Sequence, residues 1–203
     1  AVERARANAQ RNSLAQVRVE QANALDRLRA LAGEARAFNI DCSGAPALAK
    51  RVSPFLVREV AGIRVGILGA TYRFNGMVLP ENHKGVEWLD PVASLAPAVA
   101  RLRDVEHCDL VVLSSHLGMK GDNGKLGNLE IAAQVPGIHA IIICTPTLFM
   151  EEPAVVKNAL GETVVFEVGY GGTELGRLDF SFRNGKLAAW SRSPVPEGPV
   201  QDA

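Results

Sequence analysis

The sequence has no excess of charge of either sign. Its 203 residues include 22 basic and 22 acidic side chains, which gives a formal net charge of zero at pH 7. Nucleic acids and anionic membrane surfaces attract basic patches, so this balance favours neither as a partner. No apolar run is long enough to span a bilayer. The polar, arginine-rich stretch AVERARANAQRN at the start lacks the apolar core of a signal peptide. We predict a globular protein without a nucleic-acid partner or a membrane span.

Cysteine is scarce and scattered. The chain has three, Cys42, Cys108 and Cys144, and no C-x-x-C pair. This spacing excludes a zinc ribbon and a dithiol redox centre. An odd count leaves at least one thiol free unless it pairs with another chain. Because Cys108 precedes an apolar run and Cys144 ends one, we expect buried, inert thiols, and the cellular compartment stays open.

Motifs for phosphate cradling and for nucleophilic catalysis are also missing. The loop GMKGDNGKLGN is rich in glycine but lacks the Lys-Ser/Thr ending of a P-loop, so we expect a surface loop. His83, His107 and His139 stand isolated, and the spacing assembles no Ser-His-Asp or Cys-His set.

Residues 1–38 predict one long helix, from about Glu3 to about Phe38. Apolar or small residues recur by threes and fours, at Leu14, Val17, Ala24, Leu28, Leu31, Ala35 and Phe38. Two interpretations are open for this helix. Its second half packs on the sheet of its own domain, whereas its first turns, Ala1 to Asn12, have little apolar surface to bury and favour docking to a partner.

Residues 39–192 alternate strand patterns with helical ones. The runs SPFLVREVAGIRVGILGAT (two strands around Ala61-Gly62), CDLVVLSSH and IHAIIICTP predict strands. DPVASLAPAVARLRD predicts a helix with Asp90 as N-cap, and GNLEIAAQVP predicts a short one. Late strands follow in ETVVFEVG and in GRLDFSFRNGKLAAWSRS, which turns at Asn184-Gly185. This order predicts a layered α/β sandwich, and the proline-rich residues 193–203 predict a linker or a disordered tail.

One strand pattern ends on a candidate functional residue. In DLVVLSSHLG the apolar run stops at His116, and strand ends are where an α/β sheet exposes functional groups. Taken in order with PFLVREVAGIRVGILGAT, EIAAQVPGIHAIIICTPT and VVFEVGYGGTELGRLDFSF, this stretch resembles the calcineurin-like metallophosphoesterase superfamily. More narrowly, it resembles the metal-binding domain of bacterial 5′-nucleotidases and UDP-sugar hydrolases, over about residues 25–182.

The resemblance implies a di-metal site of which one ligand position is recognisable. Such hydrolases gather His, Asp and Asn donors around two ions about 3.5–4 Å apart. His116 matches the histidine of the family's THxG motif. In ICTPTL, Thr145 and Thr147 stand where the GGHSHT motif has its histidines, and Cys144 stands at its second glycine. A threonine hydroxyl is a poor ligand for a transition metal.

The family's other blocks are altered or not found. Its GNHE block matches Val17 to Glu20, where Arg18 and Val19 replace the metal-binding asparagine and the catalytic histidine. The DxH and GD segments are expected upstream, where too few residues remain for them. VGYGGTELG is expected to be a turn near the site whose glycines permit positive φ or close backbone approach. We therefore assign no catalytic residue and no intact metal centre, only a relic site of His116, Asp122, Thr145, Thr147, Gly169 and Tyr170.

These matches favour an incomplete, catalytically degenerate metallophosphoesterase-like domain. It is expected to need no cofactor and to act as a binding or structural subunit, joined to other protein subunits through the N-terminal helix and an open sheet edge. The alternative is a metal-dependent phosphohydrolase on nucleotides or sugar nucleotides, whose missing ligands for two ions such as Mn or Zn are supplied elsewhere. A third hypothesis is a small-molecule binding protein that uses the old cleft without metal. The resemblance implies a periplasmic or extracellular location.

Overall fold

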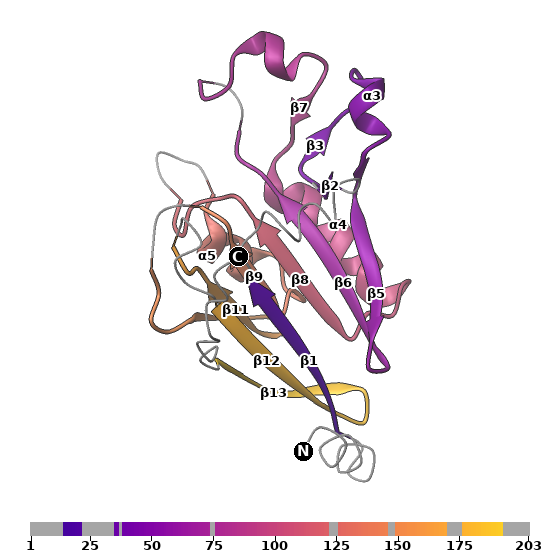
Figure 1. Ribbon diagram of the computed structural model, residues 1–203, viewed down its shortest axis with the longest axis vertical. Coiled ribbons are helices and arrows are strands. Elements are labelled where there is room, and N and C mark those ends of the chain that lie inside the picture. The colour runs from indigo at the N-terminus through magenta and orange to yellow at the C-terminus, as the bar shows by residue number, and fades with distance from the viewer. Residues whose placement is uncertain are drawn as a thin grey trace, which may run out of the picture.

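A mixed six-stranded sheet, in the order β10-β11-β9-β8-β6-β5, forms the centre of the fold in the computed structural model (Figure 1). The structure describes residues 14–21, 35–36, 38–73, 76–121, 126–145, 149–169 and 176–192. The strands of this central sheet are β5 Phe55–Val60, β6 Ile63–Ala70, β8 Leu110–Ser115, β9 Ala140–Ile143, β10 Ala154–Asn158 and β11 Gly161–Phe166. Strands β6, β8, β9 and β11 run parallel, and β5 and β10 pair antiparallel at the two edges.

The parallel strands are apolar because both of their faces are buried. Every residue of β9 (AIII) is buried, as are five of the six residues of β8 (LVVLSS). Parallel strands covered on both sides show continuous apolar runs instead of alternation, which is why these segments were predictable from the sequence. The predicted β5–β6 turn is confirmed too, with positive φ at Ala61 and Gly62.

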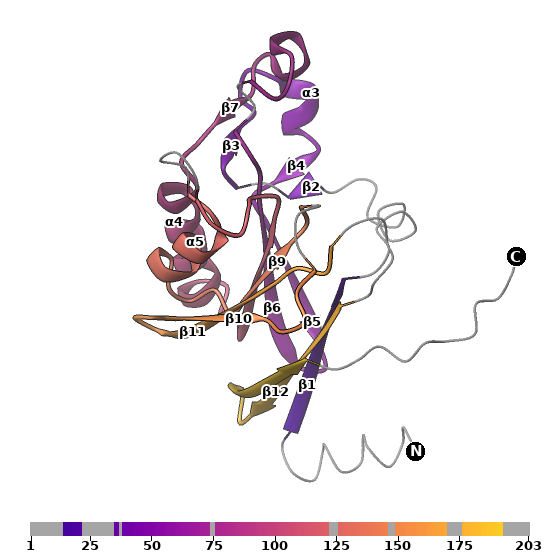
Figure 2. The same cartoon turned by 90° about the vertical axis from the view of Figure 1, so that its left-hand side faces the viewer.

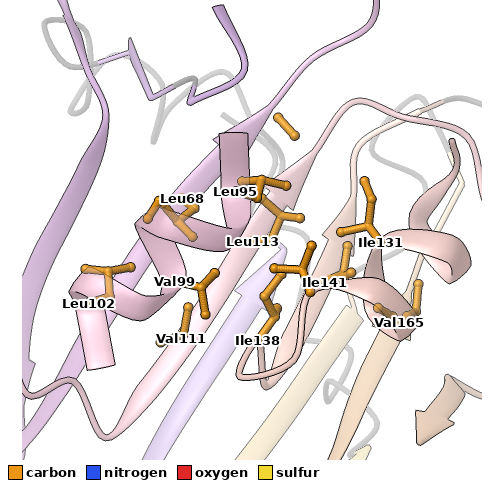
Figure 3. Close-up of a cluster of buried hydrophobic side chains, with 14 of the residues drawn as sticks. Leu68, Leu95, Val99, Leu102, Val111, Leu113, Ile131, Ile138, Ile141 and Val165 are labelled. Carbon is orange, nitrogen blue, oxygen red and sulfur yellow. The ribbon is translucent and has the colours of Figure 1, made fainter. Parts of the chain in front are cut away.

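Two helices cover one face of the central sheet. Helix α4, Pro91–Asp104, begins at the predicted N-cap, where the Asp90 carboxylate accepts the Ala93 N–H at 2.8 Å. Helix α5, Asn128–Gln134, follows the glycine-rich loop. Leu95, Val99 and Leu102 of α4 lie against the sheet side chains of Leu68, Val111, Leu113 and Ile141, and Ile131 of α5 joins the same cluster (Figure 3). The predicted spacing of α4 is confirmed.

A second, smaller sheet covers the opposite face. Its order is β1-β12-β13, formed by Leu14–Gln21, Gly176–Arg183 and Lys186–Arg192. Leu178, Phe180 and Phe182 of β12 are buried in a cluster with residues from the central sheet, among them Val112, Ile142 and Val164. Figure 2 shows the layers in order, with α4 and α5 on one side of the central strands and β1 and β12 on the other. The predicted layered α/β sandwich is confirmed.

The predicted N-terminal helix is wrong over Leu14–Gln21, which form strand β1. The backbone register pairs Val17 with Phe180 and Val19 with Leu178, antiparallel along the whole of β12. Residues Ala15 to Glu20 alternate apolar and polar, a pattern typical of a strand. They pair with β12, about 160 residues away in the sequence, and this pairing favours a strand over a helix. Ala35–Arg36 form β2, which pairs with β4, Val52–Ser53. The rest of the predicted helix up to residue 37, and the tail 193–203, lie outside the described residues.

Short elements extend beyond the carboxyl ends of β6 and β8 (Figure 1). They are β3 Ile40–Asp41, α3 Pro46–Ala49, the 3-10 helix η1 Pro80–His83 and β7 Glu87–Trp88. Buried Asn39 ties them to β6, because its amide accepts the Thr71 N–H at 2.8 Å and donates to the Thr71 carbonyl at 2.7 Å. Among the described residues, no helix is both long and apolar enough to cross a membrane.

His139 closes the opposite end of the central sheet, immediately before β9. Its Nδ1 accepts the Val111 N–H at 2.9 Å, so the neutral ring completes a backbone bond at the start of β8. Burial, reinforced by the charge of Arg103, lowers the pKa of His139 from 6.5 to about 4, and Asp109 opposes this shift. The imidazole is therefore neutral in the folded protein at neutral pH.

This histidine should make the protein less stable in mild acid. The unfolded chain binds a proton below pH 6.5 and the folded chain only near pH 4, so up to about 3 kcal/mol of unfolding free energy is lost across that window. We predict that His139→Gln, which keeps an acceptor for Val111, flattens the pH dependence in denaturant melts between these two values. His107→Asn, at an exposed position with φ 51°, is the matched control and should leave the profile unchanged. An identical pH profile for His139→Gln and the wild type would contradict this role.

Candidate functional site

Strands β8 and β9 end side by side and place the candidate residues at one edge of the sheet. His116 follows β8 directly, and its N–H donates to the Ala70 carbonyl of β6 at 2.8 Å. Cys144 follows β9, and its N–H donates to the Ser115 carbonyl at 2.8 Å. The two segments that the sequence singled out are therefore neighbours, and the predicted position of His116 at a strand end is confirmed.

The His116 ring is exposed but oriented. Its Nδ1 lies 2.9 Å from the Cys144 carbonyl oxygen, which can only accept, so Nδ1 carries the proton of the neutral ring. The Tyr72 ring lies edge-on to it at a centroid distance of 6.0 Å. The lone pair of the neutral imidazole is left on Nε2. A backbone bond of this kind commonly fixes the tautomer of a metal-binding histidine, so His116 keeps the geometry of a ligand.

Thr145, at the first histidine position of the motif, points inward. Its side chain is 3% exposed, and its Oγ1 donates to Oε1 of Glu167 at 2.9 Å. Glu167 follows β11 and is fully buried at 0% exposure. The Thr145 hydroxyl proton is therefore used inside the protein, and a neutral hydroxyl oxygen is a poor ligand for a transition metal.

Cys144 corrects a prediction, because its side chain is exposed and not buried. Its Sγ lies 3.6 Å from the hydroxyl of Ser114, which is also exposed. Strand β9 stops one residue earlier, so position 144 escapes the two-sided burial of the strand. Cys108 is buried as predicted, with a pKa raised mainly by burial, and Cys42 is buried as well.

Gly169 is the other relic-site residue that the structure describes. Its φ is +72°, and a Cβ there would collide with the Phe149 ring, so both predicted reasons for glycine apply. Asp122, Thr147 and Tyr170 lie outside the described residues. The structure thus brings His116 and Thr145 to one edge and leaves the contribution of the other three untested.

Sequence reasoning missed three residues that organise this edge. They are Glu167, Asn128 and Glu130. Asn128 is fully buried and donates from Nδ2 to the Leu117 carbonyl at 2.6 Å and to the Gly118 carbonyl at 3.0 Å. Glu130 Oε2 accepts the N–H groups of Gly121 and Gly127, each at 2.9 Å, which closes the base of the glycine-rich loop. The Asn and Glu that open helix α5 were the available signal, since such residues favour helix starts.

The described side chains at this edge do not make up a di-metal centre. Among the described residues, no group of three or more His, Cys, Asp or Glu side chains is placed to hold a metal ion. His116 offers a single nitrogen, and the Thr145 hydroxyl is already engaged. Val17 to Glu20, matched to the catalytic GNHE block, lie within β1 opposite residues 177–180 and not at a strand end. The described side chains therefore do not fit the metal pair that the resemblance implies.

Comparison with known proteins finds relatives, although no family model matches the chain. A 5′-nucleotidase of Vibrio cholerae is 25% identical over 163 residues, which cover 70% of this chain and 30% of the relative. The crystal structure of a 5′-nucleotidase precursor from Thermus thermophilus superposes with a TM-score of 0.64 at 27% identity, covering 82% of this chain and 34% of that one. The calcineurin-like phosphoesterase YfkN of Bacillus subtilis has the same fold, at a TM-score of 0.50 and 18% identity, with 71% and 51% covered.

The chain is similar in sequence to bacterial 5′-nucleotidases and similar in fold to a calcineurin-like phosphoesterase. The resemblance to the superfamily is confirmed, and the α/β sandwich is of the metallophosphoesterase type. The chain spans about a third of the length of the 5′-nucleotidases that it matches. What those proteins do as whole molecules therefore enters only as a proposal for this one.

The Thr145–Glu167 bond should be a stabilising contact. We predict that Thr145→Val, which keeps the volume but removes the hydroxyl, lowers the free energy of unfolding by about 1–3 kcal/mol, because a buried carboxylate oxygen loses a donor. Thr145→Ser should keep most of the stability. His116→Asn, at an exposed position, should change it by less than about 1 kcal/mol. Equal stability of the Val and Ser variants in urea melts would refute the contribution of the bond.

Proposed function

We propose that this chain is a catalytically degenerate metallophosphoesterase-like domain that acts as a binding or structural subunit of a larger assembly. The observation that carries the proposal is the state of Thr145, whose buried hydroxyl donates to Glu167 where the superfamily motif has a metal-binding histidine. Activation of water by two metal ions needs several converging His, Asp and Asn ligands, and a neutral threonine hydroxyl is a poor substitute for a histidine.

Two further observations support this loss of catalysis. The segment matched to the catalytic block, Val17 to Glu20, is paired along its length with β12. Among the described residues, His116 bonds the Cys144 carbonyl and Cys144 lies beside the Ser114 hydroxyl, whereas a di-metal hydrolase surrounds its ions with carboxylates and imidazoles. The fold persists without that shell because its core lies between the layers and not at the strand ends.

The open edge of the smaller sheet supports the role in assembly. Strand β1 is the outermost strand in the order β1-β12-β13, and no described strand pairs with its other side. An unpaired edge presents backbone N–H and C=O groups to another chain, and proteins commonly cover such edges. Residues 1–13, in which the sequence predicts partner binding, directly precede β1 in the chain.

The alternative function is a metal-dependent phosphohydrolase on nucleotides or sugar nucleotides with ligands supplied elsewhere. The orientation of His116 favours it, because the Nδ1 bond to the Cys144 carbonyl leaves Nε2 ready to bind a metal. The relatives named 5′-nucleotidase are about three times as long as the matched region, so another part of a longer protein, or a partner, is the source that this alternative requires. Both functions are proposed for a periplasmic or extracellular protein, as the resemblance implies.

Metal binding separates the two functions. We expect the purified chain, incubated with excess Mn²⁺ or Zn²⁺ and desalted, to retain well under about two equivalents of metal and to show no Mn²⁺-dependent hydrolysis of a generic phosphodiester. About two equivalents, with hydrolysis that His116→Ala abolishes, would establish the alternative instead. If the chain binds less than one equivalent of metal, shows no hydrolysis and loses the metal in His116→Ala, the site is accidental and the proposal of a degenerate domain holds.

Partner binding is tested separately. We expect the protein isolated from its source to co-purify with other subunits, and deletion of residues 1–13 to release them, as measured by light scattering and affinity co-purification. Lys84→Glu, at an exposed position directly after η1 and outside the smaller sheet, is the control and should leave the assembly intact. A clean monomer that the deletion leaves unchanged would overturn the assembly role.

A further inference from the structure

A cavity that is open to solvent lies at the end of the central sheet opposite the relic site. Its volume is about 450 Å³, and its walls come from the end of α4, the residues before β8 and β9, and the β10–β11 and β12–β13 turns. The residues that carry its polar chemistry are Arg103, Asp109, His139, Glu162 and Lys186. Strand β8, six residues long, separates this cavity from His116 by roughly 20 Å. The two sites are therefore independent.

The donors facing the cavity are unused. Nδ1 of His139 accepts the Val111 N–H, so the neutral ring carries its remaining proton on Nε2, and no described residue bonds that atom. Arg103 and Lys186 form no ion pair with any residue that the structure describes. The Arg103 side chain lies close to Gly137, where an added Cβ would come within 2.8 Å of the Arg103 Cδ.

Each of the two carboxylates that face the cavity has one oxygen engaged in a hydrogen bond. Asp109 Oδ2 accepts the Arg64 N–H at 2.9 Å, and Glu162 Oε1 accepts the Trp190 Nε1–H at 2.9 Å. Each bond fixes its carboxylate and leaves a second oxygen for another donor. The cavity thus presents two cations and two carboxylates drawn from different segments, together with apolar surface from Leu160, Leu187 and Cys108.

We propose that this cavity binds a small zwitterion of the free amino-acid class, with its carboxylate at Arg103, Lys186 and His139 and its ammonium at Glu162 and Asp109. The charges of the lining sum to zero, so a ligand that is neutral overall and carries both signs satisfies them. A nucleotide or another polyanion brings an excess of negative charge against the two carboxylates, which costs binding energy. The apolar side chains of the lining give the ligand's own side chain a surface to contact.

Backbone NMR titration of the full chain tests this inference. Common L-amino acids are added one at a time, and the amide resonances of Gly161, Gly185 and His139 are followed. At least one amino acid should shift these amides saturably with a Kd of about 1 mM or tighter. Its N-acetyl derivative and its decarboxylated amine should each bind at least about tenfold more weakly, because each removes one of the two charges.

Matched variants locate the site. Arg103→Gln should weaken binding by at least about tenfold. Arg101→Gln should leave binding unchanged, because Arg101 lies two residues earlier on the same helix and pairs with Glu106 at 3.6 Å. Far-UV circular dichroism and the NMR spectrum itself establish that each variant is folded. Amides near the relic site, such as that of Gly169, should not shift.

Several outcomes would overturn the proposal. They are the absence of saturable shifts up to about 10 mM of every amino acid, equal binding of the singly charged derivatives, and binding that Arg103→Gln leaves intact. Saturation by inorganic phosphate in place of amino acids would also overturn it and assign the cavity to oxyanions. None of these results bears on metal loss or assembly, so this inference and the proposed function fail separately.

Discussion

The burial of both faces of the parallel strands is the constraint on which the rest of the structure depends. Strands β8 and β9 are apolar on both sides, so each face needs a cover, which α4 and α5 provide on one side and β12 on the other. Once both faces are covered, polar chemistry is confined to the strand ends. One end carries His116 and Thr145, and the other carries His139 and Asp109.

This confinement would allow the fold to persist with the replaced metal ligands that we propose. A metal centre at the strand ends contributes little to the packing between the layers, so its residues can change without loss of the core. The replacements still satisfy local chemistry. Thr145 bonds buried Glu167, and His116 bonds the Cys144 carbonyl. Of these two bonds only the one between Thr145 and Glu167 is buried, and loss of a partner there would cost about 1–3 kcal/mol.

The spacing of apolar residues predicted the helices and strands correctly wherever it fits only one of the two. Helix α4 has a clear N-cap and helical spacing, and β8 and β9 are continuous apolar runs, so each was predicted close to its bounds. Strand β1 was missed because Leu14 and Val17 have helical spacing, whereas Val17 and Val19 have the alternating spacing of a strand. The choice between them depends on Phe180 and Leu178, distant in the sequence. Exposure of Cys144 depends on where β9 stops, a boundary that composition does not fix.

The sequence predicted where the candidate site lies, but it did not predict the hydrogen bonds of its side chains. The resemblance places His116 and Thr145 at one edge, whereas the bond from Thr145 to Glu167 depends on the alignment of β9 with β11. The opposite cavity draws on five separate segments and has no local signature. Anomalous diffraction from crystals soaked in Mn²⁺ tests the loss of the metal centre most directly. The account predicts no pair of peaks beside His116, and two strong peaks there, about 3.5–4 Å apart, would contradict it.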